Sequence, residues 1–194
     1  TYASALDEAY AEYVSANATV ATVQTAARKL FELTYADIST PADVSFLFNQ
    51  TDMAGNASVS SWTSGSCTYG WGEFERYHSP LSLKQTQNVP QGLYDVVLHA
   101  LYREDGQGSA PVLKVAADNS VTTNIPLIGS IDYEVGNAND NNWTSGNISN
   151  VPNGMQSATQ ALTHTDAVAW AKNINVGTSG QMSINIEMTS SEQW

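Results

Sequence analysis

The sequence predicts a mainly β protein, a β-sandwich preceded by one or two helices. Up to residue 33 the apolar residues recur at helical spacing, and from Thr40 onward they tend to recur at every second position, as in strands. Gly, Asn and Pro separate several short strand-like runs, and no helical pattern lies between each pair of them. This organisation is typical of sandwiches rather than of parallel sheets. The 194 residues suit one medium domain with a helical segment attached.

Residues 1–36 form the predicted helical segment, and residues 37–194 form the predicted β domain. In ALDEAYAEYV the apolar side chains fall on one face of a helix, which carries Leu6, Tyr10, Tyr13 and Val14. SANAT interrupts this pattern, and TVATVQTAARKLFEL resumes it. We expect either one bent helix or a two-helix hairpin.

Several stretches have the composition or alternation of strands, namely 43–49, 81–87, 93–104, 111–118, 120–129 and 181–188. The stretch 93–104 is apolar on both faces, as a central buried strand would be. The stretch 181–188 alternates most regularly and places on one face Met182, Ile184, Ile186 and Met188. Residues 157–173 favour a short helix over one end of the sandwich, with Trp170 packed beneath it.

The formal net charge of −12 excludes two classes of partner. Nucleic acids and anionic membrane surfaces require clusters of Lys and Arg, and only 7 such residues are scattered along the chain. No apolar run approaches the roughly 20 residues of a membrane span, so we predict no membrane insertion within this chain. An acidic surface rich in Asn, Gln, Ser and Thr suits neutral glycans and is common in exported proteins. We predict an extracellular, outer-surface or periplasmic location.

No sequence motif indicates catalysis. The three histidines fall in separate segments without metal-ligand spacing, and Cys67 is the single cysteine, which we expect to be buried or idle. Glu73 and Glu75 share a face if their segment is a strand, and paired carboxylates can drive glycoside hydrolysis. We predict a protein that is not an enzyme, with a small glycoside hydrolase as one alternative.

We predict no cofactor, and the sequence leaves a structural Ca²⁺ site as an open alternative. The Asn- and Asp-rich stretch 137–142, with Asp132 nearby, offers the oxygen ligands that Ca²⁺ prefers. Asn and Asp turn chemistry explains the same stretch equally well.

Two irregular segments, residues 62–80 and 134–156, combine flat aromatic rings with polar planar groups, and this combination indicates sugar binding. Sugar rings stack their C–H faces on Trp and Tyr, while their hydroxyl groups need carboxylate, amide or guanidinium partners. Phe74 is expected in the core. The candidate glycan-binding residues are Trp62, Tyr69, Trp71, Glu73, Arg76, Tyr77, Asp140, Asn142 and Trp143.

The stretch YHSPLSLKQTQNVPQGLYDVVLHALYRE resembles the signature of galactose-binding-like β-sandwich domains from surface and secreted glycan-utilisation proteins of gut bacterial anaerobes. The matching positions are Leu83, Gln85, Thr86, Val89, Pro90, Gly92, Tyr94, Tyr102 and Arg103. The resemblance, which extends over about residues 37–194, implies a jelly-roll sandwich that acts as a non-catalytic carbohydrate-binding module of an exported protein.

The same resemblance implies a final strand after Trp194. The sequence stops before it, so we expect either that the sequence was cut there or that the strand is missing. Without that strand a sheet edge on the C-terminal side would stay open, and a protein partner or neighbouring domain can pair with such an edge. A structural or adhesive module that binds protein is therefore the main alternative to a glycan-binding module.

Overall fold

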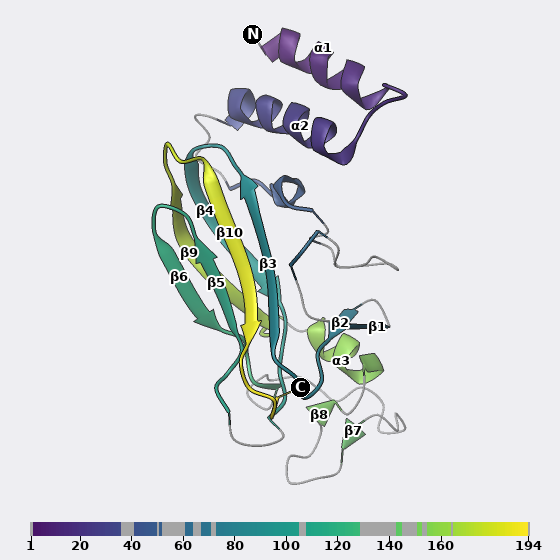
Figure 1. The fold of residues 1–194 in the computed structure, drawn as a ribbon, viewed down its shortest axis with the longest axis vertical. Helices are drawn as coiled ribbons and strands as arrows, with labels where there is room; N and C mark the ends of the chain where they lie inside the picture. Colours follow the sequence, from purple (N-terminus) through teal and green to yellow (C-terminus); the bar gives the residue numbers. More distant parts are fainter. Residues whose placement is uncertain are drawn as a thin grey trace.

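The computed structural model describes residues 2–35, 41–49, 51, 61–63, 67–70, 73–104, 108–128, 143–144, 151–152, 155–163 and 165–193. This part of the chain is mainly β, with antiparallel sheets and short N-terminal helices, as the sequence predicts. The helices α1 and α2 lie at one end of the long axis of the molecule, and a group of small elements lies at the other end (Figure 1).

The N-terminal segment is a hairpin of two helices, α1 (Tyr2–Tyr13) and α2 (Val20–Tyr35). The two helices pack against each other, and the small side chain of Ala5 is buried. The apolar face that the sequence predicts for α1 is instead exposed, at Leu6, Tyr10, Tyr13 and Val14.

Polar contacts hold the hairpin together and join it to residues 46–49, since the Gln24 side-chain amide also donates to Oδ1 of Asn49. Glu8 of α1 forms an ion pair with Lys29 of α2. The side-chain amide of Gln24 on α2 donates to the carbonyl oxygen of Phe46, at 3.4 Å, and so ties the hairpin to the β domain.

The larger sheet has four antiparallel strands in the order β3-β10-β5-β6. These strands are β3 (Leu81–Asn88), β10 (Gln181–Met188), β5 (Val112–Ala116) and β6 (Ser120–Asn124). The predicted apolar row of β10 is confirmed, because alternate residues from Met182 to Met188 are all buried. Since β10 lies between β3 and β5, it is not an edge strand. The strand expected after Trp194, and Trp194 itself, lie outside the described residues.

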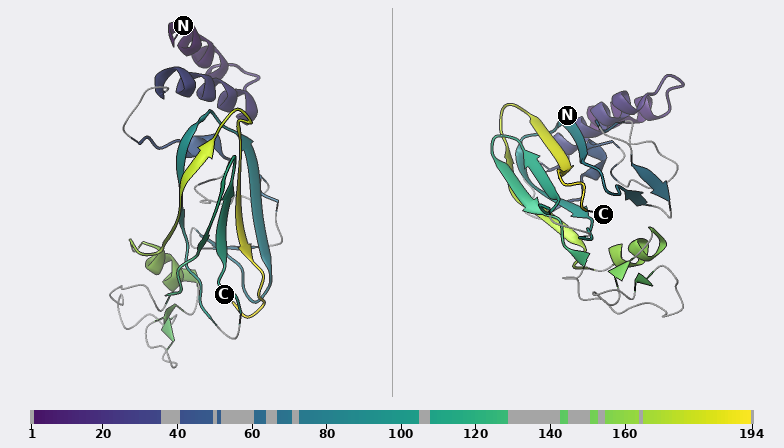
Figure 2. Two further views of the ribbon diagram at one scale, coloured as in Figure 1. Left: turned by 90° about the vertical axis from the view of Figure 1, so that its left-hand side faces the viewer. Right: turned by 60° about the horizontal axis from the view of Figure 1, so that its bottom comes forward.

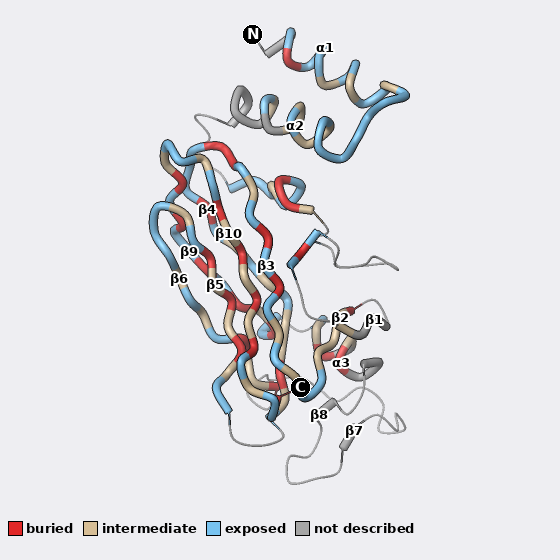
Figure 3. Tube along the Cα trace, viewed as in Figure 1, coloured by how far each residue is buried: buried red, intermediate tan, exposed pale blue. Residues whose placement is uncertain are grey.

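A second antiparallel pair, β4 (Gly92–His99) and β9 (Val168–Val176), faces the larger sheet (Figures 1 and 2). The inward side chains of this pair enter the same apolar core as Leu83, Leu113 and Val115 of the larger sheet. Buried residues run along the strands of both layers (Figure 3). The inward residues of the pair are Tyr94, Ala169, Ala171, Ile174 and Val176.

The predicted strand 43–49 is wrong, because its centre is a 3₁₀ turn, η1 (Ser45–Leu47). The Asp43 carboxylate accepts hydrogen bonds from the Ser45 backbone N–H, at 2.9 Å, and from the Ser45 hydroxyl, at 2.7 Å. This local turn chemistry competes with strand pairing, while Leu47 and Phe48 still bury their side chains in the core.

One further strand prediction and one helix prediction are corrected. The stretch 93–104 is not a central buried strand, since β4 ends at His99, and Leu93 and Val97 are exposed on its outer face. The stretch 157–173 is helical only in its first part. The helix α3 (Met155–Leu162) is followed by β9, whose small alanines conceal its alternation, and Trp170 points outward.

Candidate functional site

The end of the β domain opposite the helical hairpin gathers the two segments that the sequence marks as irregular. There lie β1 (Thr68–Gly70) paired with β2 (Glu73–Glu75), and β7 (Trp143–Thr144) paired with β8 (Val151–Pro152). The helix α3 contacts both β2 and β8. We call this region the α3 end (Figure 1).

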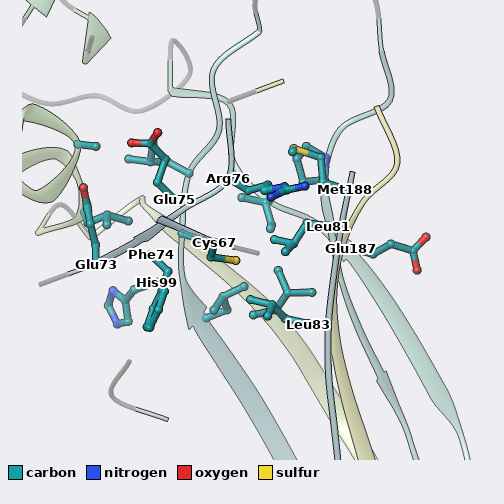
Figure 4. Close-up of a pocket in the computed structure, with 18 residues that line it drawn as sticks. Cys67, Glu73, Phe74, Glu75, Arg76, Leu81, Leu83, His99, Glu187 and Met188 are labelled. Carbon is teal, nitrogen blue, oxygen red and sulfur yellow. The ribbon is translucent and has the colours of Figure 1, made fainter. Parts of the chain in front are cut away.

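A cavity of about 300 Å³ opens between the two layers at the α3 end. Leu83 and Ile186 of the larger sheet and Leu98 of β4 form its apolar wall, and Ala158 and Leu162 of α3 complete it. Polar residues also line it, most of them from the segment that contains β1 and β2 (Figure 4). These are Cys67, Glu73, Glu75, Arg76, His99 and Glu187.

Glu73 is the unusual residue of the cavity. Its side chain is only 8% exposed, and its carboxyl group is directed toward α3 (Figure 4). Burial raises the pKa of this carboxyl to about 7, against the opposing effect of a hydrogen bond with Thr159, and nearby Glu75 raises the pKa further. The oxygen Oε2 has no hydrogen-bond partner. Glu73 can therefore change its charge near neutral pH inside an apolar wall.

Two of the other polar side chains around the cavity, Arg76 and Glu187, form hydrogen bonds with neighbours. Arg76 donates through Nε to the carbonyl oxygens of Ser79, at 3.4 Å, and Pro80, at 3.3 Å. Glu187 accepts from the Lys114 ammonium group at 2.9 Å with each carboxylate oxygen.

The thiol of Cys67 is half-buried beside the cavity. Burial raises its pKa, and the positive charge of Arg76 opposes that rise only in part. A thiol with a raised pKa is a poor nucleophile at neutral pH. This arrangement gives no support to a catalytic cysteine.

An exposed pair of stacked rings follows β2. The centroids of the Tyr77 and His78 rings are 4.0 Å apart, with an interplanar angle of 9°. His78 adopts a φ of 44°, and its backbone N–H donates to the carbonyl oxygen of Gln193 at 3.1 Å. Tyr77 is 56% exposed, so its ring is accessible to a flat ligand.

The prediction that Trp62 stacks on a ligand is wrong, because this residue is 6% exposed and belongs to the core. Its indole N–H donates to the carbonyl oxygen of Asn49 at 3.1 Å. The side-chain amide of Gln85 bonds both backbone groups of Asn49. It accepts from the Asn49 N–H at 2.8 Å and donates to the Asn49 carbonyl oxygen at 3.0 Å. The indole therefore serves packing.

The remaining candidates divide according to where they lie. Glu73 and Arg76 both line the cavity, and Phe74, expected in the core, is partly exposed beside them. The backbone of Trp143 lies in β7, at the α3 end. The side chains of Tyr69, Trp71 and Trp143, and the residues Asp140 and Asn142, lie outside the described part of the chain.

The sequence interpretation missed the position of two features. His99 and the α3 residues of the cavity carry no local motif, because only the packing of distant segments brings them together. Trp170 is 43% exposed on the outer face of β9, with the Lys172 ammonium group 5.0 Å from its ring centroid. The alternation of residues 168–176 is the signal that would have placed Trp170 outward.

Among the described residues, no group of three or more His, Cys, Asp or Glu side chains is arranged to hold a metal ion. The stretch 137–142, the candidate for Ca²⁺, lies outside those residues. In the same described part, no helix combines the length and hydropathy that crossing a bilayer requires. Comparisons of the chain with protein-family models, curated proteins and solved structures find no match.

Proposed function

We propose that the chain is a non-catalytic carbohydrate-binding module of an exported or cell-surface protein, built on a galactose-binding-like jelly-roll sandwich. The observation that supports this proposal most is the contact of α3 with both β2 and β8. Through α3, β2, which precedes Tyr77, and β8, which pairs with β7 at Trp143, lie at one end of two packed antiparallel sheets. Loops at one end of a rigid scaffold are a common place for ligand sites.

The exposed Tyr77 ring supplies the stacking surface in this proposal, and Glu75 and Arg76, its neighbours along the chain, supply hydrogen-bonding groups. The acidic chain, with its net charge of −12, favours neutral over anionic glycans. Trp62 has no part in binding, since its ring is packed in the core.

Glycan-array screening followed by calorimetry with the best glycan tests the proposal. Tyr77→Ala is expected to weaken binding by about tenfold or more, as for the loss of a central aromatic contact. Trp170→Ala is the matched control, because it removes an exposed ring from the outer face of the β4–β9 sheet. Loss of binding in Trp170→Ala, with Tyr77→Ala unaffected, would contradict the proposed location. A folded protein that binds no glycan but associates with another protein would support the adhesive alternative.

A small glycoside hydrolase is the second candidate, and the raised pKa of Glu73 favours it. A carboxylic acid that keeps its proton near pH 7 can act as a general acid, and Glu75 is a second carboxyl group beside the same cavity. Release of chromophore from nitrophenyl glycosides, abolished in Glu73→Gln, would support hydrolysis. If the chain only binds glycan, neither the wild type nor Glu73→Gln should release chromophore.

A further inference from the structure

The cavity at the α3 end has the features of a binding site for a small molecule other than a glycan. Its volume of about 300 Å³ is at the lower end of the range of small-molecule pockets, roughly 300–1,000 Å³. Its wall is dominated by aliphatic side chains from both layers, among them Leu81, Leu83, Leu98, Ile125, Ile186 and Met188. A sugar ring carries hydroxyl groups around its circumference, and many of these hydroxyl groups would have no hydrogen-bond partner against such an apolar wall.

One polar group in this wall lacks a partner. Oε2 of Glu73 is buried without a hydrogen bond, although the carboxyl group interacts with Thr159. A buried acceptor without a donor costs about 1–3 kcal/mol, and a ligand that brings an N–H or O–H to this oxygen recovers part of that cost. Glu73 is only 8% exposed and lines the cavity, so a ligand in the cavity is one source of the missing donor.

The charges around the cavity favour a cationic donor. Three glutamates, Glu73, Glu75 and Glu187, line it against a single arginine, Arg76. Lys114 neutralises Glu187 through its ion pair. Arg76 has hydrogen bonds to two backbone carbonyls. An ammonium group therefore meets a net negative wall, and a carboxylate ligand meets repulsion.

We propose that this cavity binds a small amine with an apolar body, such as an alkylamine or arylalkylamine. The ammonium group donates to Oε2 of Glu73, and the hydrocarbon part occupies the space between Leu83, Leu98 and Ile186. The amine proposal shares Glu75 and Arg76 with the proposed glycan site, but it depends on Glu73 and the cavity interior, whereas glycan binding depends on the exposed ring of Tyr77.

The test compares three probes of the same shape, hexylamine, hexanol and hexanoate, by calorimetry at pH 8. Hexylamine is expected to bind the wild-type chain more tightly than hexanol, and hexanoate is expected not to bind. Glu73→Gln should weaken hexylamine by about tenfold to a hundredfold, since a charged hydrogen bond is lost, and should leave hexanol unchanged. Glu192→Gln removes an exposed carboxylate far along the chain and is the matched control.

A pH series adds a second readout. The amine stays protonated throughout, whereas Glu73 is mostly ionised at pH 8 and mostly neutral at pH 6. Hexylamine should therefore bind about tenfold more weakly at pH 6, in proportion to the ionised fraction of Glu73. Other titratable groups that line the cavity are Cys67, Glu75, Arg76, His99 and Glu187, and the series is repeated in Glu73→Gln to separate their effect.

Ala100→Leu, which fills the cavity, keeps the test decisive if Glu73→Gln does not fold. It should abolish binding of both hexylamine and hexanol, with circular dichroism confirming a folded chain. Equal affinity for hexylamine and hexanol would overturn the proposal, because the carboxylate would then have no part in recognition. Failure of every probe to bind the folded wild-type chain would also overturn it and leave the cavity to water.

Discussion

Replacing Glu73 by Gln should remove a pH dependence from the stability of the fold. The carboxyl group of Glu73 holds its proton up to about pH 7 in the folded chain, whereas an ordinary glutamate, with a pKa of 4.5, loses it much earlier. Between these two pH values the folded state binds more protons than the unfolded state. The free energy of unfolding therefore falls as the pH rises through this window. Glutamine keeps the shape and the hydrogen bond with Thr159 but cannot ionise.

The magnitude follows from the difference between the two pKa values. From 4.5 to about 7, at about 1.4 kcal/mol per pKa unit, the wild-type chain loses at most about 3–4 kcal/mol relative to Glu73→Gln. The contribution of Glu73 is complete below pH 4.5 and is lost above about pH 7. Partial solvation of the ionised carboxylate makes this value an upper bound.

Urea unfolding of both proteins between pH 5 and pH 8, followed by circular dichroism, measures the effect. The midpoint of the wild-type chain should move toward lower urea with rising pH, relative to that of Glu73→Gln. Glu192→Gln, at an exposed site, should follow the wild-type chain. If the curves of the wild type and Glu73→Gln stay parallel over this range, the carboxyl group is not buried as described and the reasoning fails.

Three further changes test other parts of the fold. Gln85→Leu removes both hydrogen bonds to the backbone of Asn49 and should destabilise the chain by about 1–3 kcal/mol in urea unfolding; an unchanged midpoint would contradict the role of this amide. Leu113→Ala leaves a cavity at a fully buried position (0% exposed) and should lower the free energy of unfolding by about 2–5 kcal/mol. A decrease below about 1 kcal/mol would indicate a poorly packed core. Gly180→Ala forces an L side chain into a φ of 61° and should lower stability by about 1–2 kcal/mol, and no change would show that the turn relaxes. Cys67 should react with a thiol reagent more slowly than an exposed cysteine at pH 7.5, and rapid reaction would exclude its burial.

Periodicity in the sequence was sufficient to predict an element where one face is buried and carries bulky side chains. The row from Met182 to Met188 predicted β10 correctly because bulky side chains alternate with polar ones. The same signal failed in β9, where Ala169 and Ala171 fill the inward positions and do not stand out as core residues. It also misjudged the face of α1, because the composition of a helix does not reveal whether a partner covers it.

The candidate site was harder to predict, since its chemistry depends on contacts between distant segments. Glu73 is an ordinary surface residue by type, but in the described part of the chain it is buried and hydrogen-bonded to Thr159 of α3, 86 positions later in the numbering. Trp62 has the residue type and the polar sequence neighbours of a sugar-stacking residue. Its indole N–H nevertheless donates to the carbonyl oxygen of Asn49 inside the core. Aromatic composition therefore did not separate exposed rings, such as that of Tyr77, from packed ones, such as that of Trp62.

The central place of β10 has a consequence for how the chain folds. Ser82 of β3 hydrogen-bonds Asn185 of β10, 103 residues further along, and β5 pairs only with the other side of β10 and with β6. On the ribosome, β3 and β5 thus emerge long before the strand that joins them. Such long-range pairing predicts slow folding and a nascent chain with unpaired apolar strands, which chaperones have to shield until β10 arrives.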